Sequence, residues 1–195
     1  MDSGSFDRSY YQRYYYDQDT AVTGKREMRA RARLIAAYAE HVGLQVRRIL
    51  DAGCGTGLLQ APLKRLLPHA TYTGIEGSEY LCRRYGWQQA RIETFRAARP
   101  FDLVICYDVL QYLDGETATR ALTNLGRLCS GVLYFTALTR IDWEHNCDQS
   151  RTDPNVHLRS ARWYRMRLRR HFREAGAGFW LRRGAPLAVW ELEAL

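Results

Sequence analysis

The sequence has few of the features that mark membrane, secreted or metal-binding proteins. Its five cysteines are scattered, odd in number and form no Cys-x-x-Cys pair, which argues against a disulfide framework or a zinc ribbon. No apolar run approaches the ~20 residues of a membrane-spanning helix, and residues 1–5 lack the start of a signal peptide. We therefore expect a cytoplasmic chain that uses no membrane anchor.

Lysine is also nearly absent, because Lys25 and Lys64 are the only two and arginine carries almost all of the net charge of +8. A basic balance favours RNA or another acidic partner, although a coding bias toward arginine would produce the same composition. The 46% hydrophobic and 26% charged residues are typical of a globular chain. A length of 195 residues is most simply one domain with a substantial core.

The most informative stretch is Asp-Ala-Gly-Cys-Gly-Thr-Gly, which begins at Asp51. An apolar run over 46–50 predicts a strand before it, and leucines at helical spacing over 58–67 predict a helix after it. The three glycines within 53–57 allow positive φ angles and a close approach of backbone to a ligand at the helix N-terminus. A pyrophosphate-binding turn has a third glycine where this chain has Leu58, and the Asp51 carboxylate would repel a pyrophosphate. A cationic ligand without phosphate, such as S-adenosylmethionine, fits better.

A second acidic residue supports that ligand. Residues 72–76 predict a strand that ends on Glu76, 25 positions after Asp51, and a carboxylate at about that distance accepts hydrogen bonds from both hydroxyls of a ribose. With these two motifs the chain resembles the class I S-adenosylmethionine-dependent methyltransferases. The Asp51 motif matches the first motif of that family residue for residue, and Glu76 stands at its ribose-binding acid. The alternative is a plain tight turn followed by a solvated strand end.

The resemblance implies an α/β fold and covers the chain from about residue 25 to the C-terminus. It implies a single-domain Rossmann-like methyltransferase fold, with a mostly parallel seven-stranded sheet, an antiparallel last strand and helices on both faces. The residue pattern agrees, because expected strands alternate with expected helices. Besides those already given, we expect a strand that turns into a short helix over 101–113, a strand at 132–137, helices at 25–41, 78–85, 116–129 (ended by Gly131) and 160–174, and a hairpin of 179–181 with 187–192.

The resemblance also implies cofactor-binding roles. The methionyl part of S-adenosyl-L-methionine would lie against Asp51 and the glycine turn, and the ribose would lie at Glu76. The adenine would lie at Ile92 or Glu93, where the usual Gly-Asp pair of the family is absent. Tyr107 follows the fourth strand, beside the methyl group. The cofactor-binding candidates are therefore Asp51, Gly53, Cys54, Gly55, Gly57, Glu76, Ile92, Glu93 and Tyr107.

The catalytic candidates are Asp108, Tyr112 and His145. Asp108 follows the fourth strand at the acceptor side, although it can also cap the helix that begins there. Tyr112, His145 or His157 could remove a proton from an amine or hydroxyl acceptor. Residues 138–158 are too polar for a core and are expected to form a long loop that recognises the acceptor. The histidines there lack metal-ligand spacing, so we expect no metal site.

The two ends of the chain leave alternatives open. Residues 1–45 comprise a Tyr-rich segment and a helix, and the tyrosines either cover the cofactor, as in the family, or pack on the domain edge or in a dimer contact. Arg29 or Arg33 of the helix could reach the methionine carboxylate. Residues 138–175 comprise the acceptor segment and an arginine-rich helix, which either binds RNA phosphates or is a solvated face.

The sequence as a whole predicts one domain, 1–195, that is an S-adenosylmethionine-dependent methyltransferase acting on a small molecule. One alternative is methylation of RNA or protein through the basic surface, and a second is a non-catalytic S-adenosylmethionine-binding module. A nucleotide-linked oxidoreductase is disfavoured by Asp51 and the missing third glycine. No Asn-Pro-Pro-Tyr-like sequence follows the fourth strand, which argues against methylation of a nucleic acid base. The acceptor and the oligomeric state stay open.

Overall fold

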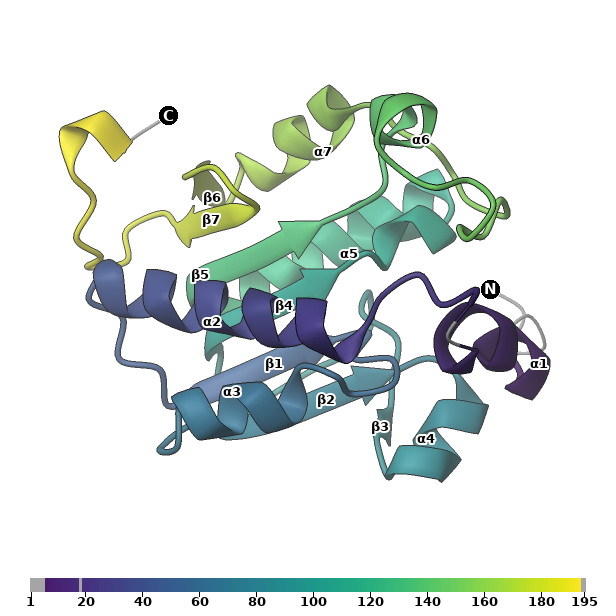
Figure 1. Ribbon diagram of the computed structural model, residues 1–195. Helices are drawn as coiled ribbons and strands as arrows, with labels where there is room; N and C mark the ends of the chain where they lie inside the picture. Colours follow the sequence, from purple (N-terminus) through teal and green to yellow (C-terminus); the bar gives the residue numbers. More distant parts are fainter. Residues whose placement is uncertain (1–5, 18, 194–195) are drawn as a thin grey trace.

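The computed structural model describes residues 6–17 and 19–193 and shows one seven-stranded sheet between two layers of helices (Figure 1). The residues 1–5, on which the expectation about a signal peptide rests, lie outside the described residues. The strand order is β3-β2-β1-β4-β5-β7-β6. The strands are β1 (Arg48–Ala52), β2 (Thr71–Glu76), β3 (Gln88–Gln89), β4 (Phe101–Tyr107), β5 (Cys129–Thr136), β6 (Phe172–Glu174) and β7 (Phe179–Arg182).

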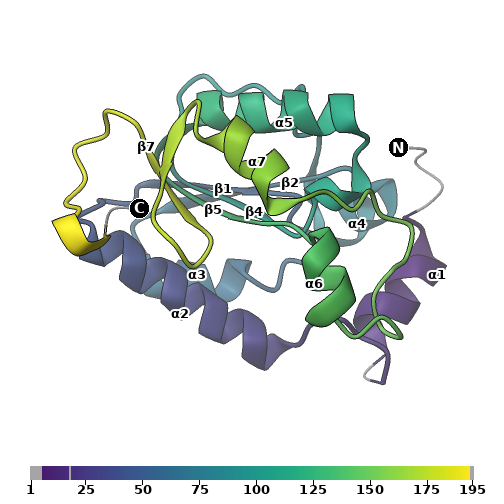
Figure 2. The ribbon, with the colours of Figure 1, turned by 90° about the horizontal axis from the view of Figure 1, so that it is seen from above.

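The sheet is parallel from β3 to β5, and β7 runs antiparallel to both of its neighbours, β5 and β6. This arrangement confirms the expected fold class. Figure 2 shows α2 (Lys25–His41) and α3 (Gln60–Leu66) on one face, and α5 (Gly115–Leu128) and α7 (Ala161–Leu168) on the other. The helix α4 (Glu79–Tyr85) lies beside β2 and β3. No helix in the described part of the chain is long and apolar enough to cross a membrane.

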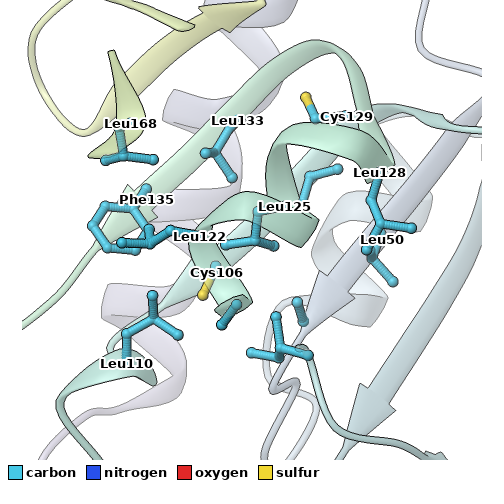
Figure 3. Close-up of a cluster of buried hydrophobic side chains, with 14 of the residues drawn as sticks. Leu50, Cys106, Leu110, Leu122, Leu125, Leu128, Cys129, Leu133, Phe135 and Leu168 are labelled. Atoms are coloured by element: carbon cyan, nitrogen blue, oxygen red, sulfur yellow. The ribbon is translucent and has the colours of Figure 1, made fainter. Parts of the chain in front are cut away.

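The core forms on both faces because successive residues of a strand point to opposite sides of the sheet. In β1, Ile49 packs with α2 and α3, whereas Leu50 packs with α5. Figure 3 shows this second cluster, in which Leu122 and Leu125 of α5 lie near Phe135 of the sheet. Strands buried on both faces read as continuous apolar runs, as β4 and β5 do.

Several local signals place elements as expected. The helix α2 spans Lys25–His41, the expected range, and buries the stripe that begins at Met28. The helix α4 begins after Ser78, whose hydroxyl accepts from the backbone N–H of Leu81, and ends at Gly86 with a left-handed φ of 72°. Both caps satisfy backbone groups that have no partner inside the helix.

The prediction that Gly131 ends the helix over 116–129 was wrong. The helix α5 ends at Leu128, and β5 begins at the next residue, so Gly131 lies inside a strand. A Cβ at Gly131 would lie 2.5 Å from the backbone oxygen of Asp102, where the β4–β5 register also shifts. This glycine therefore permits the close approach of two strands and is not a helix stop.

The C-terminal elements also differ from the prediction. The expected helix over 160–174 ends at Leu168, and Phe172–Glu174 form β6, which pairs with β7 as the hairpin. The expected second hairpin strand, 187–192, is irregular and ends in a short 3-10 helix, η3 (Glu191–Glu193). Phe172 is fully buried, and its spacing from Leu168 suits one helical face, so the apolar pattern could not reveal the change to a strand.

Residues 138–158 are not the plain loop that was expected. They contain α6 (Arg140–His145), which begins with a capping box between Thr139 and Asp142. The N-terminal segment is helical as well, with α1 (Arg8–Tyr11) followed by a π-helical turn, η1 (Gln12–Tyr16), and a 3-10 turn, η2 (Leu110–Tyr112), follows β4. The N-terminal segment and α6 stand at the carboxyl ends of the parallel strands (Figure 1), and η2 comes shortly after the carboxyl end of β4. Ligands bind at this edge in sheets of this type.

Candidate functional site

Two adjoining cavities open at the carboxyl ends of the parallel strands. One, of about 390 Å³, is lined by Asp51 and is here called the Asp51 cavity. The other, of about 370 Å³, is lined by Glu76 and is called the Glu76 cavity. Seven residues line both cavities and mark where they meet, namely Tyr10, Tyr15, Gly53, Gly55, Tyr107, Asp108 and Tyr112.

The glycine turn after β1 forms the floor shared by the two cavities. Its three glycines have φ angles of 82°, 55° and 75°, all in the left-handed region. A Cβ at Gly53 would lie 2.5 Å from Val109, and one at Gly57 would lie 2.5 Å from Trp87. A Cβ at Gly55 would meet nothing within 4 Å, so the open space of the cavities lies over this residue. Gly57 lines neither cavity and serves the packing of the turn.

Glu76 ends β2 at the rim of its cavity and is fixed by backbone donors. Its Oε2 accepts from the N–H of Gly55 at 2.9 Å, and its Oε1 accepts from the N–H groups of Gly77 at 2.8 Å and Ser78 at 2.9 Å. A carboxylate has about four acceptor positions, so capacity is left for a hydroxyl donor. The bond to Gly55 joins the two halves of the expected motif directly.

Asp51 is a buried carboxyl beside the turn. Its side chain is 3% exposed, and the Tyr72 hydroxyl donates a hydrogen bond to its Oδ2. Burial raises the pKa of Asp51 to about 7, the bond from Tyr72 acts in the opposite direction, and the charge of Glu76 raises it further. A cation bound beside Asp51 would favour its ionised form. The buried carboxyl and the space over Gly55 therefore suit a ligand with an ammonium group.

Asp108 stands at the point where β4 leaves the sheet. It has a φ of 53°, a strained conformation for a residue with a side chain, and its Oδ1 accepts from the Thr136 hydroxyl at 2.9 Å. It does not cap the turn η2, because the N-cap position is Val109 and has no side-chain bond. The alternative role of Asp108 as a helix cap is therefore wrong. Burial raises the pKa of Asp108 above its usual range.

The tyrosines of the N-terminal segment cover the place where the cavities meet. The Tyr10 hydroxyl donates to the Tyr112 hydroxyl at 3.0 Å, and the Phe6 ring meets the Tyr112 ring edge-on at 5.3 Å. The Ser78 hydroxyl donates to the backbone oxygen of Phe6 at 2.8 Å. These contacts hold the segment across the ends of β2 and β4. Burial raises the pKa of Tyr112 to about 12, so its hydroxyl stays protonated near neutral pH.

Ile92 and Glu93 line the Glu76 cavity. Ile92 is 6% exposed and belongs to the core, and the Asn124 amide donates to its backbone oxygen at 2.7 Å. The Glu93 carboxylate lies 4.0 Å from the guanidinium of Arg91. The apolar Ile92 and the acidic Glu93 are the two residues at which the family resemblance implies the adenine.

His145 and the arginines behave differently from the expectation. The His145 side chain is 68% exposed and lines neither cavity, as is also true of His157. Arg29 and Arg33 are exposed. Arg31 turns inward instead, with its guanidinium 4.1 Å from the centre of the Tyr107 ring. No signal in the sequence distinguishes Arg31 from the other arginines of this helix.

The remaining polar lining comes only in part from residues that the sequence did not single out. Gln111 of η2 is such a residue, whereas Asn146, Asp148, Arg151, Thr152 and Asp153 belong to residues 138–158, the segment expected to recognise the acceptor. The arginine-rich helix α7 contributes to neither cavity, and its Arg165 and Arg169 pair with Glu174. Within the described residues, no group of three His, Cys, Asp or Glu side chains could hold a metal ion.

Comparisons with known proteins agree with this geometry. The model of a methyltransferase domain matches residues 50–131, which contain the glycine turn, Glu76 and Asp108. The chain is 31% identical over 94 residues to trans-aconitate 2-methyltransferase from Pseudomonas paraeruginosa, covering 44% of this chain and 34% of that enzyme. It is 31% identical over 114 residues to ubiquinone biosynthesis O-methyltransferase from Methylococcus capsulatus, covering 51% and 47%. The chain therefore spans less than half the length of these relatives.

A likeness also extends to a solved structure. Magnesium protoporphyrin IX methyltransferase from Synechocystis PCC 6803, solved with bound SAH, superposes with a TM-score of 0.65 over 92% of this chain and 97% of that chain. The two sequences are 17% identical, so the likeness shows the fold. The matched family model ends at residue 131, before the segment after α6, which lines the Asp51 cavity.

Proposed function

We propose that this chain, which has a Rossmann-like fold and matches the model of a methyltransferase domain over residues 50–131, transfers the methyl group of S-adenosyl-L-methionine to a small-molecule acceptor. The observation that carries the proposal is the junction of the two cavities. There the glycine turn, the Glu76 carboxylate held by the N–H of Gly55, and Asp108 come together within the residues that the methyltransferase model matches.

The residues present suit this cofactor along its length. Asp51 would pair with the ammonium group of the methionyl part, and the backbone around Gly55 has room for it. Glu76 would accept a hydrogen bond from a ribose hydroxyl at its remaining acceptor position. Ile92 and Glu93 would contact the adenine, the first through its apolar surface and the second through its exocyclic amine. When bound, the cofactor supplies an electrophilic methyl group, and the protein supplies position and electrostatics.

Asp108 and Tyr112 would act at the acceptor. Asp108 lines both cavities, and its raised pKa makes its carboxylate a stronger base than an ordinary aspartate. The Tyr112 hydroxyl, which stays protonated, would position the acceptor as a hydrogen-bond donor rather than remove its proton. Tyr10 and Tyr15 would exclude water from the reacting atoms. His145 has no role in this proposal because it lies outside both cavities.

Two observations favour a small molecule over RNA or protein. The Asp51 cavity, at about 390 Å³, has the size of a small-molecule site, and the arginines of α7 lie outside it. The curated relatives, by their names, act on trans-aconitate and in ubiquinone biosynthesis, which also involve small molecules. We further propose that residues 1–45 cover the cofactor, that 138–175 shape the acceptor side of the single domain, and that the chain is cytoplasmic, where its free cysteines suit a reducing compartment.

The test is a calorimetric titration of the purified chain with S-adenosyl-L-homocysteine. Micromolar binding is expected, and Glu76→Ala should reduce the affinity by about ten- to a hundredfold, since a hydrogen bond to a charged acceptor is lost. The matched control is Glu79→Ala, which removes an exposed carboxylate three residues later that pairs with Arg83 on the surface. A folded native chain that does not bind S-adenosyl-L-homocysteine would overturn the proposal.

The non-catalytic alternative is separated from an enzyme by a second measurement. A chain that binds S-adenosyl-L-homocysteine is mixed with S-adenosyl-L-methionine and a pool of small metabolites, and the release of S-adenosyl-L-homocysteine is followed. An enzyme gives release that depends on the pool and falls at least about a hundredfold in Asp108→Asn, the range in which loss of a general base falls. A binding module gives the same slow release with and without the pool.

A further inference from the structure

The acceptor side of the Asp51 cavity holds a hydrogen-bond acceptor that no donor meets. Gln111 is 4% exposed, and its Nε2 donates to the backbone oxygen of Asp108 at 2.9 Å. A carbonyl oxygen only accepts, so the Gln111 atom that meets it must be the amide nitrogen and the other terminal atom must be the oxygen. The other end, Oε1, is buried and has no hydrogen-bond partner among the described residues. A buried acceptor without a donor is costly, and Gln111 lines the cavity, where a ligand N–H would satisfy it.

The charges around Gln111 have the sign that a cation requires. Asp108, Asp148 and Asp153 line the same cavity, and Asp153 is 6% exposed, with the backbone N–H of Asn155 donating to its Oδ1 at 2.9 Å. Among the described residues that line this cavity, Arg151 is the one cation. It donates to the backbone oxygen of Ala21 at 2.7 Å, and its positive charge acts on the exposed Asp148.

Aromatic rings complete the lining. Tyr10, Tyr14, Tyr15, Tyr107 and Tyr112 all contribute to the Asp51 cavity. The faces of such rings attract ammonium groups within about 6 Å. Burial raises the pKa of Tyr10 as well as that of Tyr112, so these hydroxyls add no negative charge of their own near neutral pH. The rings therefore add favourable surface for a cation and leave its charge to the aspartates.

Building on the proposed function, we propose that the methyl acceptor is a small molecule with a primary or secondary amine, bound as its ammonium ion by Gln111 Oε1, Asp153 and the tyrosine rings. A carboxylate acceptor would face Asp108, Asp153 and a buried oxygen that has no proton to give. A hydroxyl acceptor would satisfy Gln111 but would gain nothing from the aspartates. An ammonium group satisfies the oxygen and the carboxylates together.

The transfer balances with residues at the junction of the cavities. The ammonium gives one proton to the carboxylate of Asp108, which leaves a lone pair on nitrogen. That lone pair forms the N–C bond to the methyl group while the C–S bond breaks, and the two electrons of the broken bond stay on sulfur. The products are the methylated ammonium ion, S-adenosyl-L-homocysteine and protonated Asp108. The raised pKa of Asp108 suits it to hold that proton until the site opens.

The test compares three probes of one shape, benzylammonium, benzoate and benzyl alcohol. Each is titrated by calorimetry into the chain already saturated with S-adenosyl-L-homocysteine. Benzylammonium should bind at least about tenfold tighter than either of the others, a difference of about 1.4 kcal/mol. Equal affinities, tighter binding of benzoate, or no binding of benzylammonium to the saturated chain would each overturn the inference. Failure of S-adenosyl-L-homocysteine to bind at the start would instead count against the proposed function.

Variants show whether the preference comes from the assigned residues. Asp153→Asn and Gln111→Met should each reduce the affinity for benzylammonium by about tenfold and leave the affinity for S-adenosyl-L-homocysteine within about twofold. Glu116→Gln, which removes an exposed carboxylate outside both cavities, should change neither. Circular dichroism establishes that each variant is folded. A preference for the ammonium probe that survives both substitutions would contradict the assignment.

Discussion

Tyr72→Phe tests the electrostatics of the cofactor side, because it removes one hydroxyl and leaves the ring. The Tyr72 hydroxyl donates to Asp51, and a hydrogen bond to a charged group contributes about 1.5–3 kcal/mol. At 1.36 kcal/mol for each pKa unit, its loss should raise the pKa of Asp51 by about one to two units from its value of about 7. Asp51 would then be largely protonated at neutral pH.

The consequence for binding follows from the sign of this shift. An ammonium ligand binds the ionised form of Asp51, so affinity rises as pH rises through the pKa. At about pH 7 half of the native carboxyls are ionised, against about 1–9% in the variant, which predicts binding about five- to fiftyfold weaker. At about pH 9 the two chains should agree within about twofold, because Asp51 is then at least half ionised in both.

The assay is a calorimetric titration with S-adenosyl-L-homocysteine at several pH values for the two chains. The amino group of the ligand titrates identically with both, so the ratio of their affinities isolates Asp51. Adenosine, which has no ammonium group, should bind both chains equally at every pH. Tyr85→Phe is the matched control, since it removes a surface hydroxyl that contacts Tyr16. A constant affinity ratio across the pH range, or the same pH dependence for adenosine, would refute the role of Asp51.

Three further predictions follow from the site. Asp51→Asn should stabilise the ligand-free chain by up to about 4 kcal/mol at pH 8. The pKa of Asp51 is higher in the folded than in the unfolded chain, so the native chain loses stability as pH rises from the unfolded pKa through about 7, whereas Asn stays neutral. Chemical denaturation at about pH 4 should show little difference between the two chains. Gly53→Ala should lower the free energy of unfolding by about 1–3 kcal/mol, since it adds a Cβ 2.5 Å from Val109 at a φ of 82°, whereas Gly77→Ala, with open space around it, should change it by less than about 1 kcal/mol. His145→Ala should leave methyl transfer within about twofold of the native rate. A larger loss would contradict the conclusion that His145 has no catalytic role.

The parts of the fold that sequence signals located are those in which the signal is local. Ser78 and Gly86 bound α4 because a hydroxyl cap and a left-handed glycine act on backbone groups within one turn of the helix. The glycine turn after Asp51 is equally local, because its positive φ angles demand glycine whatever surrounds it. These features needed no knowledge of the rest of the chain.

The errors arose where distant residues decide the structure. In the sequence, the position of Gly131 is typical of a helix stop. In the structure, Gly131 lies where β4 and β5 approach each other so closely that a Cβ would meet the backbone oxygen of Asp102. Phe172 belongs to the strand β6 and not to an extension of α7, and this strand forms because it pairs with β7. Gln111 and Arg31 are ordinary polar residues in the sequence, and only the tertiary fold brings Gln111 to the Asp51 cavity and Arg31 over the Tyr107 ring. Sequence reasoning therefore found the glycine turn, Glu76 and the segment over 138–158, but it did not find Gln111 or Arg31.

The position of Tyr10 and Tyr15 has a kinetic consequence. Both residues belong to the short segment over residues 6–16, and both line the Asp51 cavity and the Glu76 cavity. A movement of this segment away from Ser78 and Tyr112 uncovers the two compartments in one event. Exchange of two molecules bound in them would then depend on the same displacement, and neither molecule would leave through it without uncovering the other.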